Sequence, residues 1–134
     1  MHRRFGRDVE FFVIYIKEAH PEDGWVLSSN RRSGIEVPEP ATVDERNEVA
    51  AACAVRLRLR MPVLLDGMDN RVAFEYGGWP DRLYLVGRDG RIAFQGDPGP
   101  FGFKPELLEE AIERELGRSG RIAASGSPTP AMAK

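Results

Sequence analysis

Hydrophobic and polar positions in the first half of the chain predict a strand, a long loop and a helix. The run VEFFVIYI at 9–16 does not alternate between apolar and polar residues, which predicts a parallel strand covered on both faces. Residues 20–42 contain Pro, Gly, Ser and Asn and predict a long connection. Residues 42–59 predict a helix that Thr42 or Asp44 caps at its start. Its inward stripe is expected to contain Val49, Ala50, Cys53, Ala54 and Leu57.

The middle of the chain predicts a second strand and a short helix. MPVLLD at 61–66 is a short apolar run and is expected to form another buried strand. NRVAFEYG at 70–77 predicts a helix that Asn70 caps and Gly77 ends, because glycine tolerates the backbone conformation that follows a helix. Its inward residues are expected to be Val72, Ala73 and Tyr76.

The last third of the chain predicts a β-hairpin and a final helix. RLYLV and RIAFQG flank a turn built on Asp89 and Gly90, which is a strong hairpin signal. A helix is expected to begin at Pro105 and to end at Gly117. Residues 118–134 are small, polar and contain proline, so a disordered tail is expected there. The inward residues of the final helix are expected to be Leu107, Leu108, Ile112 and Leu116.

The order of these elements predicts an α/β fold in one domain over residues 1–117. Strands and helices alternate in the first half, which is typical of a parallel sheet, and the second half adds an antiparallel pair covered by a helix. This layout is similar to the C-terminal two-thirds of a thioredoxin-like fold. The resemblance implies a central mixed sheet flanked by helices that lacks the first strand and most of the first helix of that fold.

Composition and charge narrow the classes of function. The chain has 134 residues, of which 42% are hydrophobic and 30% charged, with a formal net charge of −2. This balance gives no general attraction to nucleic acid or to an anionic membrane. Arg56, Arg58 and Arg60 form a local basic run that is expected to be a solvated helix face. No apolar run approaches the roughly 20 residues of a membrane span, so the expected location is cytoplasmic.

The single cysteine limits the redox chemistry of the chain. With only Cys53, an intramolecular disulfide, a CxxC pair and a cysteine-rich zinc site are all excluded within these residues. Cys53 lies on the apolar stripe of its predicted helix, so it is expected to be buried and inert.

Ionisable residues gather directly after the first predicted strand, in the sequence KEAHPEDGW. His20 stands just past the carboxyl end of that strand, where open α/β sheets bind ligands, and imidazole can transfer protons near neutral pH. Glu18 lies two residues earlier and can orient or charge the imidazole. Alternatively, His20 caps the turn before Pro21 and the acidic groups are solvated. A metal site at Glu18, His20, Glu22 and Asp23 is a weaker alternative, and no metal is expected.

The two tryptophans are candidates for a substrate pocket. Trp25 and Trp79 could each line an aromatic slot, and each could equally fill the core. Pro80 follows Trp79 directly before a strand, at the point where thioredoxin-like proteins carry a cis-proline that borders the redox centre. We therefore expect a cis Trp79–Pro80 bond at the edge of the site.

Three blocks of sequence carry a resemblance to a known family. YIKEAHPEDGW at 15–25, the segment PVLLDGMDNRVAFEYGGWPDRLYLVGRDGRIAFQG at 62–96 and GPFGFKPE at 99–106 are similar to the iodothyronine deiodinases and their bacterial deiodinase-like relatives. The resemblance extends over about residues 8 to 116. It implies a thioredoxin-fold oxidoreductase that uses a selenocysteine or cysteine nucleophile.

The resemblance also implies which parts of the site this chain contains. The family nucleophile follows the first strand and would fall upstream of Met1, and MHRRFGRD is similar to the end of the helix that carries it. The position of the nucleophile upstream of Met1 has three alternative explanations: a late start codon, a UGA codon read as a stop, or a natural loss of the redox centre. His20 and Glu18 match the family's active-site histidine and glutamate. The family's second histidine is missing from VPEPATVDER, which indicates a divergent bacterial relative.

The expected function is thiol-dependent reductive deiodination or related redox chemistry, with thyroxine 5'-deiodinase activity as its type. The small-molecule substrate is expected to meet Trp25, Trp79 and Pro80, and an exogenous thiol would regenerate the nucleophile with no bound cofactor. As given, the chain is expected to be inactive. The alternatives are a non-catalytic thioredoxin-like binding module and a metal-assisted hydrolase. Apolar surface of FFVIYI is expected to be exposed and to drive aggregation or formation of a homodimer.

Overall fold

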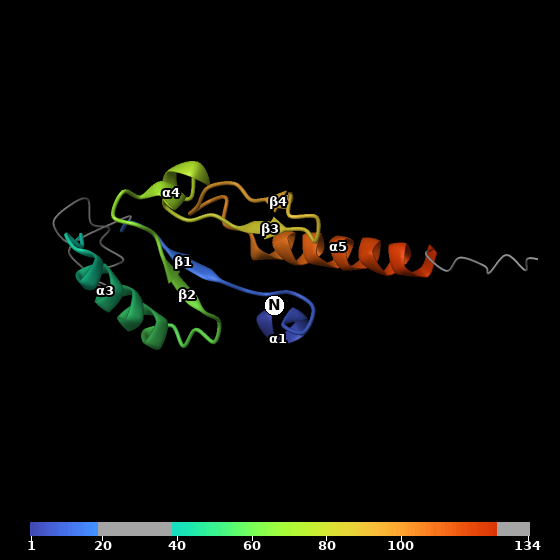
Figure 1. Ribbon diagram of the computed structural model, residues 1–134, viewed down its shortest axis with the longest axis horizontal. Coiled ribbons are helices and arrows are strands. Elements are labelled where there is room, and N and C mark those ends of the chain that lie inside the picture. The colour runs from blue at the N-terminus through green and yellow to red at the C-terminus, as the bar shows by residue number, and fades with distance from the viewer. Residues whose placement is uncertain (19–38, 126–134) are drawn as a thin grey trace, which may run out of the picture. The chain divides into compact units, whose positions relative to one another are not determined.

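The structure of the protein is a computed structural model that describes residues 1–18 and 39–125 (Figure 1). The chain divides into two compact units. Among the described residues, the first unit lies within Met1–Arg82 and Asp97–Phe103, and the second within Leu83–Gly96 and 104–125. Each unit has its own small sheet, so the described residues form a mixed α/β structure of small sheets and helices.

The first unit is built on two parallel strands, β1 (Val13–Tyr15) and β2 (Val63–Leu65). The register pairs Val13 with Val63 and Tyr15 with Leu65. Main-chain bonds continue the ladder at both ends, because Val13 N donates to Pro62 O at 3.0 Å and Asp66 N donates to Tyr15 O at 2.9 Å. The two strands predicted for this half of the chain are confirmed, although each is shorter than its apolar run.

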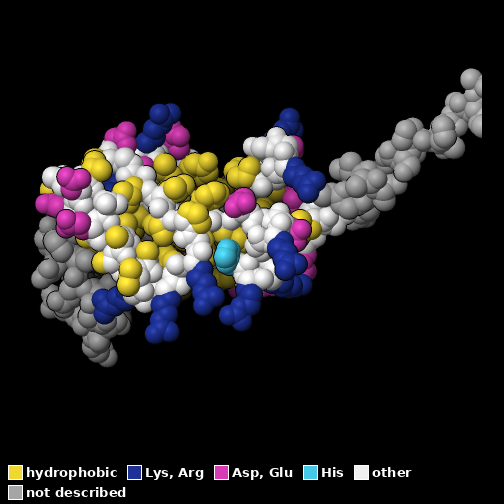
Figure 2. All heavy atoms as spheres, turned by 60° about the horizontal axis from the view of Figure 1, so that its bottom comes forward, with side chains coloured by type: hydrophobic (Ala, Val, Ile, Leu, Met, Phe, Trp, Pro, Cys, Tyr) yellow, Lys and Arg dark blue, Asp and Glu magenta, His cyan; other side chains and the backbone are white. Residues whose placement is uncertain are grey.

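One face of this sheet is open to solvent. Phe12 and Ile14 are 55% and 42% exposed, and Leu64, the register partner of Ile14, is 47% exposed. The prediction that the first strand is covered on both faces is therefore wrong for the described residues. The expectation of exposed apolar surface on FFVIYI is confirmed, and exposed hydrophobic side chains appear in yellow in Figure 2.

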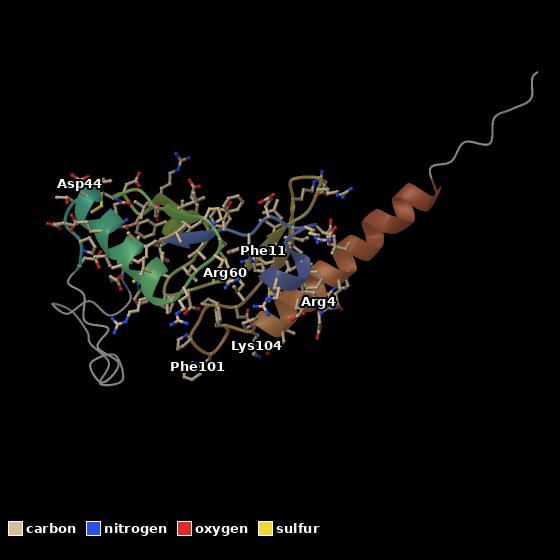
Figure 3. All side chains as sticks on the ribbon, turned by 90° about the horizontal axis from the view of Figure 1, so that it is seen from below. Arg4, Phe11, Asp44, Arg60, Phe101 and Lys104 are labelled. Atoms are coloured by element: carbon tan, nitrogen blue, oxygen red, sulfur yellow. The ribbon has the colours of Figure 1, made fainter. Side chains whose placement is uncertain are left out.

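Helix α3 (Val43–Arg56) packs on β2 and begins where the sequence predicts. Thr42 caps it, since the Oγ1 atom of Thr42 accepts a hydrogen bond from Glu45 N at 3.1 Å. Asp44 lies in the first turn, as Figure 3 shows. Leu57 was expected to face inward, but it is 65% exposed because the helix ends at Arg56 and the chain turns away.

Two short helices complete the first unit. Helix α1 (His2–Phe5) buries Phe5, and helix α4 (Arg71–Glu75) buries Ala73. Gly77 follows α4 with a φ of +55°, in the left-handed region, as predicted for the residue that ends this helix. Tyr76 was expected to face inward but is 42% exposed, because it occupies the C-cap of a helix of only five residues.

The second unit is a β-hairpin packed against a helix. Strands β3 (Tyr84–Val86) and β4 (Ile92–Gln95) pair antiparallel, as predicted. Their turn uses Gly90 at a φ of +78°, and the Asp89 carboxylate accepts a hydrogen bond from Arg91 N at 3.0 Å.

Helix α5 (Pro105–Ser125) packs on both strands of the hairpin. The buried side chains of this unit are Leu85, Leu108, Ala111 and Ile112. Leu107 was expected among them but is exposed. The predicted end of the helix at Gly117 is also wrong, because the helix continues to Ser125. The last part of the predicted tail, residues 126–134, lies outside the described residues.

Candidate functional site

The candidate site lies where the parallel strands end. Strand β1 ends at Tyr15 and β2 at Leu65, so Glu18 and Asp66 both follow the carboxyl edge of the sheet. Ligands of open α/β sheets bind at this edge. Two of the predicted site residues, His20 and Trp25, lie outside the described residues. Their roles therefore stay predictions.

Glu18 is half-buried in an environment that favours its neutral form. Burial raises the pKa of its carboxyl group, and the nearby Glu39 carboxylate raises the pKa further, whereas the Arg46 guanidinium lowers it. The net effect is an upward shift in the pKa of Glu18. A carboxyl group with a raised pKa at a sheet edge is typical of proton-transfer sites.

Trp79 and Pro80 lie beside Glu18. The Trp79 Nε1 atom donates a hydrogen bond to the Glu18 carbonyl oxygen at 3.4 Å, and the Lys17 ammonium stands 5.5 Å from the centre of the Trp79 ring. Trp79 is 43% exposed, so part of the residue is available at the surface. The Trp79–Pro80 peptide bond is cis, as predicted. The structure thus brings together Glu18, Trp79 and Pro80 from the predicted set.

Arg46 is a residue of this site that the sequence reasoning missed. It projects from the first turns of α3, and only 1% of it is exposed. Its Nη1 atom donates to the carbonyl oxygens of Gly67 at 2.8 Å and Asp66 at 3.3 Å, and its Nη2 atom donates to Asn70 Oδ1 at 3.0 Å. Nη2 also stands 3.8 Å from Glu39 Oε1. A buried cation needs such partners, because removing it from water is costly.

Asp66 was missed as well, and it does the work that was assigned to Asn70. Asn70 stands at the N-cap of α4 but makes no capping bond with its side chain. The two carboxylate oxygens of Asp66 accept the amides of Val72 at 3.0 Å and Ala73 at 2.9 Å instead. Asp66 is 4% exposed, so these bonds satisfy a buried charge at a helix start.

A signal for Arg46 was present in the sequence. Arg46, Ala50 and Cys53 follow one another at spacings of four and three residues, which places the arginine on the predicted inward stripe of its helix. A charged residue on such a stripe is rarely buried unless it is paired. No comparable signal marks Asp66, because its partners depend on how the chain turns after β2.

Cys53 faces the same region but is a poor nucleophile. Its side chain is half-buried, so the expectation of a fully buried thiol is too strong. Burial raises the pKa of the thiol, the Glu18 carboxylate raises it further, and Arg56 lowers it. Since the thiolate is the reactive form, a raised pKa lowers the reactivity of Cys53.

Metal-ligating side chains do not gather into a cluster within the described residues. Across residues 1–18 and 39–125, no group of three or more His, Cys, Asp and Glu side chains is placed to hold a metal ion. Three of the four metal ligands considered from the sequence, His20, Glu22 and Asp23, fall outside those ranges.

An open hollow of about 560 Å³ lies among the segments that lead into β1 and β2, away from Glu18. Arg3, Arg7, Arg58 and Arg60 line it together with Met1, His2, Gly6, Leu59 and Met61. The hollow therefore lies near the amino-terminal ends of β1 and β2, whereas the candidate site lies at their carboxyl ends.

This arrangement can support proton transfer, and the thiol of the sequence is not activated. Glu18 supplies a carboxyl group whose pKa is raised, first by burial and then by Glu39, and Trp79 supplies a partly exposed aromatic side chain beside it. Cys53, the only thiol in the sequence, is not activated.

Comparison with known proteins identifies the class. The model of the family described as iodothyronine deiodinase matches residues 1–116. Thyroxine 5-deiodinase of Ovis aries is 36% identical to the chain over 112 residues, and type II iodothyronine deiodinase of Petromyzon marinus is 36% identical over 115 residues. Thyroxine 5-deiodinase of Homo sapiens is 34% identical over 118 residues. The chain therefore belongs to the iodothyronine deiodinase family.

The matches cover most of this chain but a smaller share of each relative. Each covers 83% of this chain but only 36%, 38% and 35% of the sheep, lamprey and human proteins, so the chain spans about a third of the length of these relatives. The expectation of a bacterial deiodinase-like relative is wrong, because the matching relatives are animal deiodinases. Within the described residues, no helix has both the length and the apolar character that crossing a membrane requires.

Proposed function

We propose that this chain forms the acid–base and pocket-lining part of a deiodinase, an oxidoreductase that removes iodine from an iodothyronine at the expense of a thiol. The observation that carries the proposal is the coincidence of two independent findings. The family match covers residues 1–116, and a half-buried carboxyl group with a raised pKa lies at the carboxyl edge of the parallel strands, at Glu18.

The proposed reaction oxidises two thiols to a disulfide for each iodine that it removes. A selenolate or thiolate attacks the iodine, the carbon–iodine bond breaks with its electron pair left on the ring carbon, and that carbon takes a proton. A first thiol then displaces iodide from the nucleophile, and a second thiol releases the nucleophile and leaves as a disulfide. The substrate is reduced, two thiols are oxidised, and no bound cofactor takes part.

Glu18 and His20 would manage the protons of this reaction. Imidazole changes charge near neutral pH and can deliver a proton to the ring carbon. A carboxylate two residues away would orient the imidazole and stabilise its charged form. Trp79 and Pro80, beside Glu18, would present an apolar surface to the aromatic substrate.

The nucleophile of the reaction would come from a selenocysteine or cysteine outside residues 1–134. Cys53 does not fit the role, because burial and the Glu18 charge both raise the pKa of its thiol. The chain alone is therefore expected to be inactive.

A thioredoxin-like fold is the architecture that suits this proposal. It would account for the parallel pair β1–β2, for the antiparallel pair β3–β4 packed on α5, and for the cis-proline that precedes β3. Among the described residues β1 pairs only with β2, which leaves the other edge of β1 available for a further strand.

The proposal is tested by measuring iodide release from thyroxine in the presence of dithiothreitol. The chain alone is compared with a longer product of the same reading frame that includes the codons before Met1. Activity is expected only from the longer product, and only if those codons include cysteine or selenocysteine. Glu18→Gln and His20→Ala are expected to lower kcat in that product, whereas Cys53→Ser is the matched control and should leave kcat unchanged. Full activity of the chain alone would refute the proposal. Loss of activity of the longer product on Cys53→Ser would refute it as well.

A second candidate function is a non-catalytic binding module that accepts a partner strand. The open edge of β1 and the exposed side chains of Phe12, Ile14 and Leu64 favour it. This candidate predicts that the longer reading frame has no cysteine or UGA codon in the segment before Met1. It also predicts that a peptide able to add as a strand protects the amides of β1 from hydrogen exchange.

A further inference from the structure

The open hollow of about 560 Å³ belongs to the first unit and is lined by four arginines. Arg3 and Arg7 come from α1 and the turn after it. Arg58 and Arg60 come from the segment between α3 and β2, where Figure 3 labels Arg60. No Asp or Glu is among the residues that line the hollow. Guanidinium groups are always charged, so four positive charges converge here in a chain whose formal net charge is −2.

The charges of these four arginines are not neutralised within the part of the chain that the structure describes. No salt bridge joins any of the four guanidinium groups to a carboxylate of residues 1–18 or 39–125, and all four residues are exposed. By contrast, Arg46, Arg71 and Arg114 each stand 2.8 to 3.8 Å from a glutamate oxygen. Like charges that converge on one concave surface raise the local potential and attract an anion.

The backbone at Arg58 is a second and independent indication of a function at the hollow. Arg58 has a φ of +50°, in the left-handed region. It follows the C-cap of α3, where Arg58 N donates to Val55 O at 3.1 Å and Leu59 N donates to Ala54 O at 3.0 Å. This position usually holds glycine, because a Cβ atom is disfavoured in that conformation. Backbone strain of this kind clusters at sites where a side chain serves a function.

The size and charge of the hollow favour a small phosphorylated molecule. Its volume of about 560 Å³ lies within the range of small-molecule sites, about 300–1,000 Å³. A terminal phosphate group carries roughly −1.5 to −2 charges and three acceptor oxygens, and a guanidinium group can bind it with two parallel hydrogen bonds. A chain of phosphates therefore matches four converging guanidinium groups better than a single carboxylate does.

We propose that this hollow is a binding site for a small soluble molecule that carries a diphosphate or triphosphate group, held by Arg3, Arg7, Arg58 and Arg60. The hollow lies near the amino-terminal ends of β1 and β2, whereas Glu18 follows the carboxyl end of β1. The phosphate site is therefore separate from the proposed deiodinase site and does not depend on that function.

The test is isothermal titration calorimetry of the full chain with inorganic triphosphate at low ionic strength, where charge interactions are least screened. Arg58→Gln and Arg60→Gln are each expected to weaken the affinity about tenfold, the usual effect of losing one charge-assisted hydrogen bond. Arg88→Gln removes the same charge from an exposed position between β3 and β4 of the second unit. It is the matched control and should leave the affinity unchanged.

Arg58→Gly separates a binding role from a structural one. Glycine relieves the left-handed backbone, so the melting temperature is expected to rise by a few degrees while the affinity falls as it does in Arg58→Gln. The absence of triphosphate binding by the wild type, an unchanged affinity in Arg58→Gly, or an equal loss in Arg88→Gln would overturn the proposal. Tighter binding to an oligothymidylate or to vesicles that contain phosphatidylserine than to triphosphate would also overturn it, because the ligand would then be nucleic acid or membrane.

Discussion

Replacing Asp66 by alanine tests whether the carboxylate after β2, rather than Asn70, stabilises the start of α4. The substitution removes the acceptor of two amides, Val72 N and Ala73 N. Ala73 is 5% exposed, so its amide is left without water or partner, while the half-buried Val72 amide can be hydrated in part. An unsatisfied buried donor costs about 1–3 kcal/mol, so we expect Asp66→Ala to lower the free energy of unfolding by about 2–4 kcal/mol.

The assay is urea unfolding followed by circular dichroism, with hydrogen exchange of the Ala73 amide as a local readout. Asp69→Ala is the matched control in the same turn. Asp69 accepts one amide, Arg71 N at 3.2 Å, from an exposed position, so its loss is expected to cost about 0.5 kcal/mol or less. Equal losses for Asp66→Ala and Asp69→Ala, or an Ala73 amide that exchanges no faster than before, would show that the reasoning is mistaken.

Three further predictions follow from the exposed and ionisable groups. Because the pKa of Glu18 is raised on folding, the native state binds more protons than the unfolded chain between the two pKa values, and stability falls as the pH rises through that window. Glu18→Gln should therefore raise the melting temperature near about pH 7 and change it little below about pH 4, and a difference independent of pH would contradict this. The Glu18 charge also raises the pKa of Cys53, so alkylation of Cys53 by iodoacetamide should be slower than that of free cysteine and should accelerate in Glu18→Gln; an unchanged rate argues against this coupling. Finally, the wild-type chain should self-associate through the open sheet face, and Ile14→Glu with Leu64→Glu should give a monomer in size-exclusion chromatography. Val55→Glu, at a residue 79% exposed on α3, is the control that should leave association unchanged, and a wild-type monomer would rule out this interface.

Features set by local sequence were predictable. The hairpin turn at Asp89 and Gly90, the cap at Thr42 and the glycine after α4 each depend on neighbouring residues, and each is confirmed. The cis Trp79–Pro80 bond was also expected, though only through the family resemblance.

Inward-facing residues near helix ends were predicted less well. Leu57 and Tyr76 lie at or beyond the last turns of α3 and α4, where the helical spacing no longer determines direction. Leu107 precedes Leu108, whose side chain is buried. Neighbouring residues of an α-helix point in directions about 100° apart, which is enough to expose Leu107. Periodicity therefore identifies a stripe but not where the stripe stops.

The polar part of the site depends on contacts that are distant in sequence. Arg46 bonds to residues 20 to 24 positions further along the chain, and the Trp79 indole reaches the Glu18 carbonyl across 61 positions. No local pattern encodes such pairs. Glu18 was predicted because it follows an apolar strand. Asp66 was missed because its role requires the folded turn, and the spacing that signals burial of Arg46 does not indicate its partners.

The start of α3 is capped by reciprocal hydrogen bonds among its own first residues and those just before them. Besides the bond from Glu45 N to Thr42, the Glu45 carboxylate accepts Ala41 N at 2.7 Å, so both halves of this reciprocal pair come from residues 41–45. Residues added or deleted ahead of Ala41 would therefore leave the helical register of α3 unchanged. A change in the length of the connection ahead of residue 39 would therefore leave Arg46, one residue past the pair, with its hydrogen bonds to the turn after β2.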